Sequence, residues 1–139
     1  MESILKFLRT AYELHQVIYG MLEEYGLSKG KFTILIIMYA EAREEGINPS
    51  ELAEKAGVSR ATITGLLSRL ERDCIIERKS DLHDGRMTNV RLSASGIDLM
   101  NKVLPLHFVH TSRLMSGLSE QEHTLLESLL QKIRAGISI

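Results

Sequence analysis

The chain has 139 residues, of which 44% are hydrophobic and 25% charged, and its formal net charge at pH 7 is -1. This length suits one domain, or two closely joined halves, with a substantial core, and no apolar run is long enough to cross a bilayer. A single cysteine excludes an intrachain disulfide. No signal peptide is evident at the N-terminus, so we expect a cytoplasmic protein.

Two helices are predicted in the first third of the chain. Apolar residues recur at helical spacing over residues 4–22, and Gly26 is suited to ending that helix. A second segment begins at Ser28, which suits an N-cap, and passes through a dense apolar patch over 32–39. The composition of this patch would also fit a strand, but the acidic, Ala-containing tail that closes at Gly46 favours a buried helix.

Residues 48–72 predict two short helices joined by a tight turn. Asn48 as N-cap and Pro49 at the first helical position start the first helix. Gly57 can adopt the left-handed conformation of the turn, and Val58 can fill the angle between the helices. Ser59 then caps a second helix, whose buried face is expected to be Ile63, Leu66, Leu67 and Leu70. This arrangement is a helix-turn-helix.

A charged loop with Gly85 near its tip lies between two short β-type runs, 75–79 and 88–92, and predicts a hairpin. Ser93 then caps a long amphipathic helix that Pro105 should kink, and a capping box at Ser119 and Glu122 starts the last helix. The predicted fold class is therefore mainly α with a small β-hairpin wing: a winged helix-turn-helix over 28–96 with helices at both ends.

The terminal helices carry more apolar surface than a winged helix of this size needs. We therefore expect residues 1–27 and 97–139 to form a helical dimerisation region. A homodimer would also place two recognition helices at half-sites about one turn of DNA apart.

If the protein binds double-stranded DNA, the helix over about 60–72 enters the major groove. The candidate contacts at its start and on its outward face are Ser59, Arg60, Ala61, Thr62, Thr64, Gly65, Ser68 and Arg69. Ser59 and Thr62 can donate to phosphates, together with the N–H groups at the helix start. The alternative is that Ser59 is only a cap and Arg69 only a solvated charge.

The wing over about 80–88 offers Arg86 beside Gly85, where a guanidinium could enter a narrow minor groove. His83 is a second candidate contact. Asp81 and Asp84 would repel phosphate, so we expect them to pair with neighbouring arginines and hold the wing in shape. A solvated loop with no partner is the alternative.

The charge of the predicted DNA-binding region is close to neutral. Residues 48–92 carry eight Lys and Arg against seven Asp and Glu. A few placed cations, rather than a broad positive field, would have to attract DNA. A winged-helix module that binds a protein instead of DNA is therefore the alternative function. No catalytic activity is expected, because no phosphate cradle, nucleophile elbow or carboxylate pair is found.

The order of these segments resembles the MarR family of bacterial transcriptional regulators over nearly the whole chain. The resemblance is carried by "SELAEKAGVSRATITGLLSRLE", by "IIERKSDLHDGRMTNVRLSASG" and by "LSEQE" before a Leu-rich helix. Asp81, Asp84 and Arg86 match the wing signature of the family. The resemblance implies a homodimer with interlocked terminal helices, a pseudo-palindromic operator, and often a small-molecule effector site between the dimer and DNA-binding parts. We predict a transcriptional regulator that acts as a repressor and releases DNA when an effector changes the spacing of its two recognition helices.

Three residues depart from the family pattern. The family often has a basic residue where this chain has His83, so one phosphate contact would become weaker or pH-sensitive. A basic residue is also common at Gly65, and its absence removes a side-chain reader and lowers helix propensity. Cys74 stands where a glycine usually ends the recognition helix, which predicts a strained or shifted helix end.

Tyr12, His15 and Tyr19 share one face of the first helix and could line an effector pocket, although core packing explains their spacing equally well. Cys74 could sense oxidants, but we expect a partly buried structural thiol.

His107 and His110 are one helical turn apart, and His15 and His123 could lie nearby. No cysteine or clear carboxylate partner completes a metal site with them. We therefore expect no metal and no cofactor.

Overall fold

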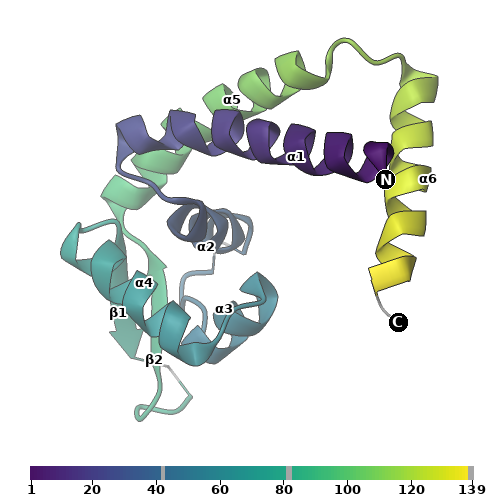
Figure 1. The fold of residues 1–139 in the computed structure, drawn as a ribbon. Coiled ribbons are helices and arrows are strands. Elements are labelled where there is room, and N and C mark those ends of the chain that lie inside the picture. Colours follow the sequence, from purple (N-terminus) through teal and green to yellow (C-terminus); the bar gives the residue numbers. More distant parts are fainter. Residues whose placement is uncertain (42, 81–82, 138–139) are drawn as a thin grey trace. The chain divides into compact units, whose positions relative to one another are not determined.

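The fold is described from a computed structural model, for residues 1–41, 43–80 and 83–137. The elements follow in the order α1 (Glu2–Gly20), a short 3-10 helix η1 (Met21–Tyr25), α2 (Lys29–Ala40), α3 (Pro49–Ala56), α4 (Arg60–Arg72), β1 (Ile76–Ser80), β2 (Thr88–Leu92), α5 (Ala94–Met115) and α6 (Glu120–Ile137) (Figure 1). The predicted fold class is confirmed. None of the described helices is long and apolar enough to span a membrane.

Polar side chains start the helices where the sequence predicts. The side-chain oxygens of Ser28, Asn48, Ser59 and Ser93 each accept a backbone N–H at 2.7–3.2 Å. At the start of α6 the capping box is reciprocal: Ser119 N donates to Glu122 Oε2 at 2.8 Å, and Glu122 N donates to Ser119 Oγ at 3.2 Å. These bonds satisfy N–H groups that have no partner inside their own helix.

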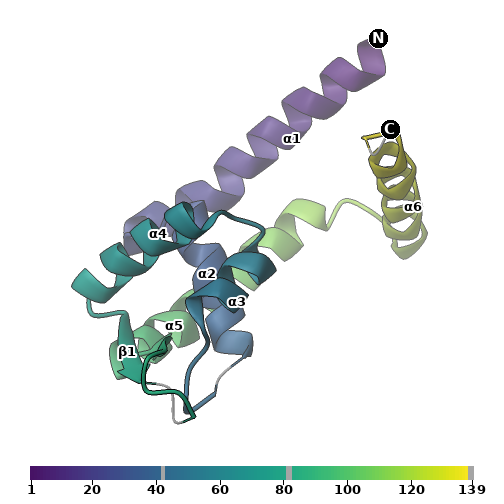
Figure 2. The same cartoon turned by 90° about the horizontal axis from the view of Figure 1, so that it is seen from below.

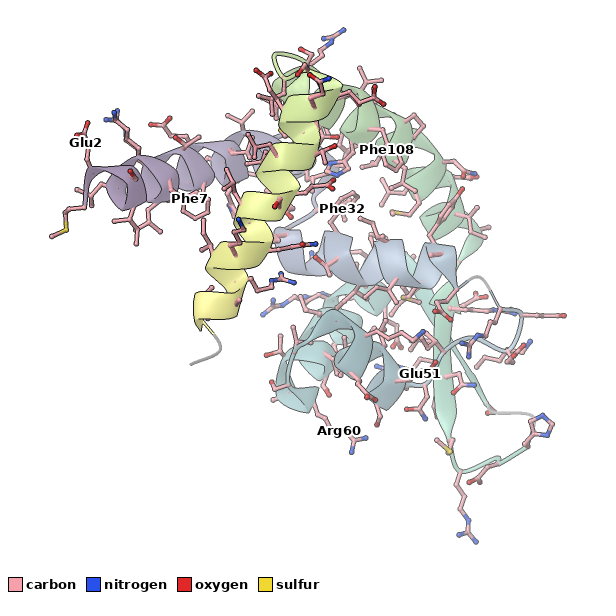
Figure 3. All side chains as sticks on the ribbon, turned by 90° about the vertical axis from the view of Figure 1, so that its right-hand side faces the viewer. Glu2, Phe7, Phe32, Glu51, Arg60 and Phe108 are labelled. Atoms are coloured by element: carbon pink, nitrogen blue, oxygen red, sulfur yellow. The ribbon has the colours of Figure 1, made fainter. Side chains whose placement is uncertain are left out.

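The chain divides into two compact units, Met1–Pro105 and Leu106–Ile139. In the first unit, α2 packs against α3, α4 and β2. Phe32 of α2, labelled in Figure 3, belongs to the core of this unit. Its fully buried side chains are Leu22, Leu27, Phe32, Ile34, Leu35, Leu52, Ile63, Leu67, Leu70, Val90, Met100 and Val103. Helix α1 projects from these packed helices (Figure 2) and buries none of its own residues.

Two local features differ from the sequence prediction. Helix α2 ends at Ala40, well before Gly46, and Gly46 instead takes a positive φ of 81° beside β2. A Cβ atom at Gly46 would lie 2.6 Å from the Val90 carbonyl oxygen, so glycine allows this close approach. Val58 does not fill the interhelical angle, because its side chain is exposed. Helix α5 includes Pro105, and the kink expected there stays a prediction.

The end of α4 confirms the strain expected at Cys74. Cys74 has a φ of 60°, the left-handed conformation that a glycine adopts without steric cost. The Ile75 N–H donates to Leu70 O and the Cys74 N–H donates to Glu71 O, both at 2.9 Å. This pair of bonds is the Schellman motif, in which glycine is the usual residue at the position of Cys74.

The start of α5 packs directly on this turn. Ser93 N donates to Ile75 O at 3.0 Å, and Ser93 Oγ donates to Cys74 O at 2.6 Å. Gly96 is buried, and a Cβ atom there would lie 2.1 Å from the Ile75 carbonyl oxygen. Gly96 therefore lets α5 approach the backbone that follows α4.

We predict that Gly96→Ala lowers the free energy of unfolding by about 2–3 kcal/mol, because the added methyl group cannot fit against a backbone carbonyl. The matched control is Gly65→Ala in α4, where a Cβ atom meets nothing within 4 Å. This control should raise the free energy of unfolding by about 0.5–1 kcal/mol through helix propensity. Urea denaturation of both variants measures the difference, and equal stabilities would contradict this packing.

Candidate nucleic-acid interface

Helix α4 buries one face and exposes the other. Ile63, Leu67 and Leu70 are buried and Leu66 is half-buried, as the sequence predicts. Arg60 projects from the start of the helix, away from the core (Figure 3). The predicted contact residues Ser59, Arg60, Ala61, Thr62, Thr64, Ser68 and Arg69 are all exposed. Gly65 is half-buried, and the space where its side chain would stand is open.

Hydrogen bonds at the start of α4 assign different roles to its hydroxyl groups. Ser59 Oγ accepts from Thr62 N at 3.1 Å and donates to Thr62 Oγ1 at 3.0 Å. Ser59 thus caps the helix, and its hydroxyl already donates a hydrogen bond to Thr62. The Thr62 hydroxyl can still donate to an acceptor outside the protein. Thr64 donates to Arg60 O at 2.7 Å, which leaves its hydroxyl as an acceptor.

Most cations around α4 are paired with carboxylates inside the protein. Lys31 lies 3.7 Å from Asp73, Arg78 pairs with Glu71, and Arg91 lies 2.7 Å from Glu77. Lys55 and Arg43 share Glu41 and Glu51. Within the described ranges, no ion pair engages the remaining arginines of this region, which are Arg60, Arg69, Arg72 and Arg86. The net charge of this region is therefore near zero although its cations fall into two groups, those paired with carboxylates and those without an ion pair.

The wing is an antiparallel hairpin whose register runs from Ile76 opposite Leu92 to Ser80 opposite Thr88. At its tip, Asp84 Oδ1 accepts from Arg86 N and Asp84 O accepts from Met87 N, both at 3.0 Å. Asp84 thus braces the turn through the backbone on both sides of Arg86. Asp81, the other predicted brace, lies outside the described residues. His83 and Arg86 are exposed.

A short segment before α3 holds the base of the wing, and the sequence reasoning missed it. Ile47 N donates to Val90 O at 2.8 Å, and Val90 N donates to Ile47 O at 2.9 Å. Ile47 thus adds a one-residue strand, which is too short to leave a periodic signal. We call residues 44–47 and 89–91 the wing root.

Side chains reinforce the wing root. The amide of Asn89, which is buried, donates to Glu45 O at 3.1 Å. Arg91 Nη1 and Lys79 Nζ donate to Glu44 O at 2.9 and 3.3 Å. The only signal for these contacts in the sequence is a polar residue, Asn89, beside the apolar Val90.

Comparison with known proteins gives consistent results. The model of the MarR family matches residues 27–88. The repressor YetL of Bacillus subtilis is 30% identical over 97% of this chain and 83% of its own length. The repressor MprA of Escherichia coli is 31% identical over 81% of this chain and 64% of its own length. A crystal structure of a complex of Staphylococcus aureus MepR with DNA matches with a TM-score of 0.82 and 27% identity, covering 98% of each chain.

The structure places the three candidate effector residues on α1. The rings of His15 and Tyr19 lie 4.6 Å apart, and Tyr19 is half-buried. Tyr12 is 65% exposed, so it is not part of the core of its own protomer. Core packing within one chain therefore accounts for Tyr19 but not for Tyr12.

Cys74 and the histidines also have defined surroundings. The expectation of a partly buried Cys74 is wrong, because the side chain is exposed at the end of α4. No group of three or more His, Cys, Asp or Glu residues that could hold a metal ion is found in the described part of the chain. His107 is half-buried on α5, and its pKa is lowered because burial disfavours the charged imidazolium and His110 adds repulsion.

We predict that His107 makes the protein less stable in acid. Because its pKa is lower in the folded state than in the unfolded state, its full contribution is present above pH ~6.5 and is lost as the pH falls through the folded-state value. His107→Gln should therefore flatten the decline in free energy of unfolding between neutral and acidic pH. The exposed His15→Gln is the control, and a His107→Gln profile parallel to wild type would refute the assignment.

Proposed function

Because this chain belongs to the MarR family of transcriptional regulators, we propose that it is a cytoplasmic repressor that binds a pseudo-palindromic operator in double-stranded DNA as a homodimer. Helix α4 would lie in the major groove and the wing in the minor groove. We assign the chain no catalytic activity.

The observation that carries this proposal is the separation of charges around α4. Carboxylates inside the domain engage Lys31, Arg43, Lys55, Arg78 and Arg91. Within the described part of residues 28–96, the arginines left without an ion pair are Arg60, Arg69 and Arg72 on α4 and Arg86 at the tip of the wing. Phosphates and base edges are the partners that guanidinium groups in these positions would meet.

The contacts divide into positioning and reading groups. The Thr62 hydroxyl and the N–H groups at the start of α4 are suited to phosphates, which fix the register of the helix on DNA. Arg60, Ala61, Thr64, Ser68 and Arg69 would face base edges or the backbone, with Gly65 as a gap between them. Arg86 would enter the minor groove, with His83 beside it at the backbone.

The apolar faces of the terminal helices support the homodimer. Helices α1 and α6 bury no residue of their own in the single chain. Exposed apolar side chains on them include Ile4, Leu5, Leu8, Leu125, Leu129 and Ile133. We propose that residues 1–27 and 97–139 bury these side chains against a second copy, because apolar surface of this extent is rarely left in water.

An effector would act by shifting populations. A small molecule bound near Tyr12, His15 and Tyr19 lowers operator affinity only if it binds the DNA-free geometry more tightly. The ratio of the effector affinities for the DNA-free and the DNA-bound geometries sets the largest possible change in DNA affinity.

We predict that Arg86→Ala weakens binding to the DNA that flanks the gene of this protein by ~10-fold at moderate salt. It should also reduce the dependence of log K on log salt concentration by about one unit, because one contact with the phosphate-lined groove is lost. Fluorescence anisotropy over a salt series measures both quantities. Arg9→Ala, which removes the same charge from α1, is the control and should leave the salt slope unchanged.

The alternative, a winged-helix module that binds protein, leads to a different result. Wild type would then show no specific DNA binding at moderate salt, and Arg86→Ala would behave like wild type in every DNA titration. The affinity for a protein partner would then need not fall steeply with salt concentration.

We predict that Gly65→Lys raises DNA affinity several-fold and steepens the salt slope by about one unit, because the added side chain enters open space on the exposed side of α4. Gly65→Ala is the matched control, since it gives the same helix propensity gain without the charge. If Gly65→Lys bound no more tightly than Gly65→Ala, α4 would not face DNA at this position.

A further inference from the structure

A pocket of about 690 Å³ lies beside the wing root, at the end of α2 and the start of α5. It belongs entirely to the first unit of the chain. Its apolar lining is formed by Met38, Ile47, Val90, Leu92, Ala94 and Ile97. Pockets that bind small organic molecules have volumes of about 300–1,000 Å³ and are lined mostly by apolar side chains.

The charged lining of this pocket is acidic overall. Three glutamates, Glu41, Glu44 and Glu77, face two arginines, Arg43 and Arg91. Glu41 is ionised, since hydrogen bonds from Lys55 and then from Arg43 lower its pKa. The lining therefore has one more carboxylate than guanidinium group, and Lys55, which lies outside the lining, pairs with Glu41.

The two arginines are already engaged. Arg91 Nε lies 2.7 Å from Glu77, and Arg43 Nη2 lies 2.6 Å from Glu41. An anionic ligand would have to displace a carboxylate from one of them. The Glu44 carboxylate, by contrast, makes no hydrogen bond or ion pair with the residues the structure describes, although the Glu44 carbonyl accepts from Arg91. The group available to a ligand is thus a carboxylate.

We propose that this pocket binds a small organic cation, with its ammonium group against Glu44 and a flat apolar body against Leu92, Ala94 and Ile97. A cation would pair with the Glu44 carboxylate, and its apolar body would leave water for an apolar surface. The site is separate from the α1 face that carries Tyr12, His15 and Tyr19.

The same residues connect the pocket to both DNA-contacting parts. On one side, Glu41 pairs with Lys55 and Arg43 pairs with Glu51, which ties the lining to α3. On the other side, Ile47 and Arg91 hold the wing root. A ligand that spreads this pocket would move the wing relative to the helix-turn-helix.

This consequence for DNA rests on the proposed function, whereas binding of the cation does not. If the cation weakens operator binding by a given factor, the operator must weaken cation binding by the same factor.

Three probes with one apolar body test the site: 2-naphthylmethylammonium, 2-naphthylmethanol and 2-naphthoate. Isothermal titration of the full chain should give an affinity for the ammonium about 10-fold higher than for the alcohol, and the lowest affinity for the carboxylate. Glu44→Gln should abolish the preference for the ammonium over the alcohol. Glu45→Gln, which neutralises the adjacent residue outside the lining, is the control and should keep the preference.

Two further measurements locate the site and separate it from the DNA question. Ala94→Phe adds bulk at the lining and should weaken all three probes, and backbone amide shifts caused by the ammonium should centre on residues 38–47 and 89–97. Equal affinities for the three probes, equal effects of Glu44→Gln and Glu45→Gln, or shifts centred on α1 would each overturn the proposal. Cation binding with these signatures in a protein that binds no DNA would refute the proposed function and leave the site standing.

Discussion

The two hydrogen bonds between Ile47 and Val90 are the constraint on which the working parts of this molecule depend. They join the segment before α3 to the second strand of the wing, so the helix-turn-helix and the hairpin share one anchor. Gly46 allows the backbones to approach, and Asn89 and Arg91, on either side of Val90, donate to the carbonyl oxygens of Glu45 and Glu44. Since the wing is only a two-stranded hairpin, which is marginal by itself, this third strand and the core beneath it hold the tip in place relative to α4.

Much of the fold can be predicted from the sequence, because the signals are local. Ser28, Asn48, Ser59 and Ser119 are helix caps in the structure, as their spacing to the following apolar residues predicts. The strain at Cys74 also follows from the sequence, since a side chain stands where the helix end needs a left-handed residue. The end of α2 at Ala40 does not follow from the sequence, because Gly46 resembles a helix terminator, whereas its role depends on Val90, more than forty residues away.

The candidate site, like the fold, can be predicted from the sequence only in part. The exposed face of α4 follows from helical periodicity, and the tip of the wing follows from turn chemistry. The sequence does not predict which cations remain available to DNA, because Lys31 pairs with Asp73 and Arg78 pairs with Glu71 only in the folded chain. A net charge near zero is therefore compatible with a surface on α4 and the wing tip that carries arginines without an ion pair. The pocket beside the wing root was equally beyond sequence reasoning, because its lining comes from four separate segments.

We propose that two copies of this winged helix read DNA with α4 in the major groove and the wing in the minor groove. Hydroxyl-radical footprinting and guanine-methylation interference on the DNA flanking the gene test it most directly. We expect two major-groove contact regions about 10 base pairs apart, or a small multiple of that, each flanked on its outer side by minor-groove protection. A single contact region, or major-groove contacts with no minor-groove protection, would contradict it.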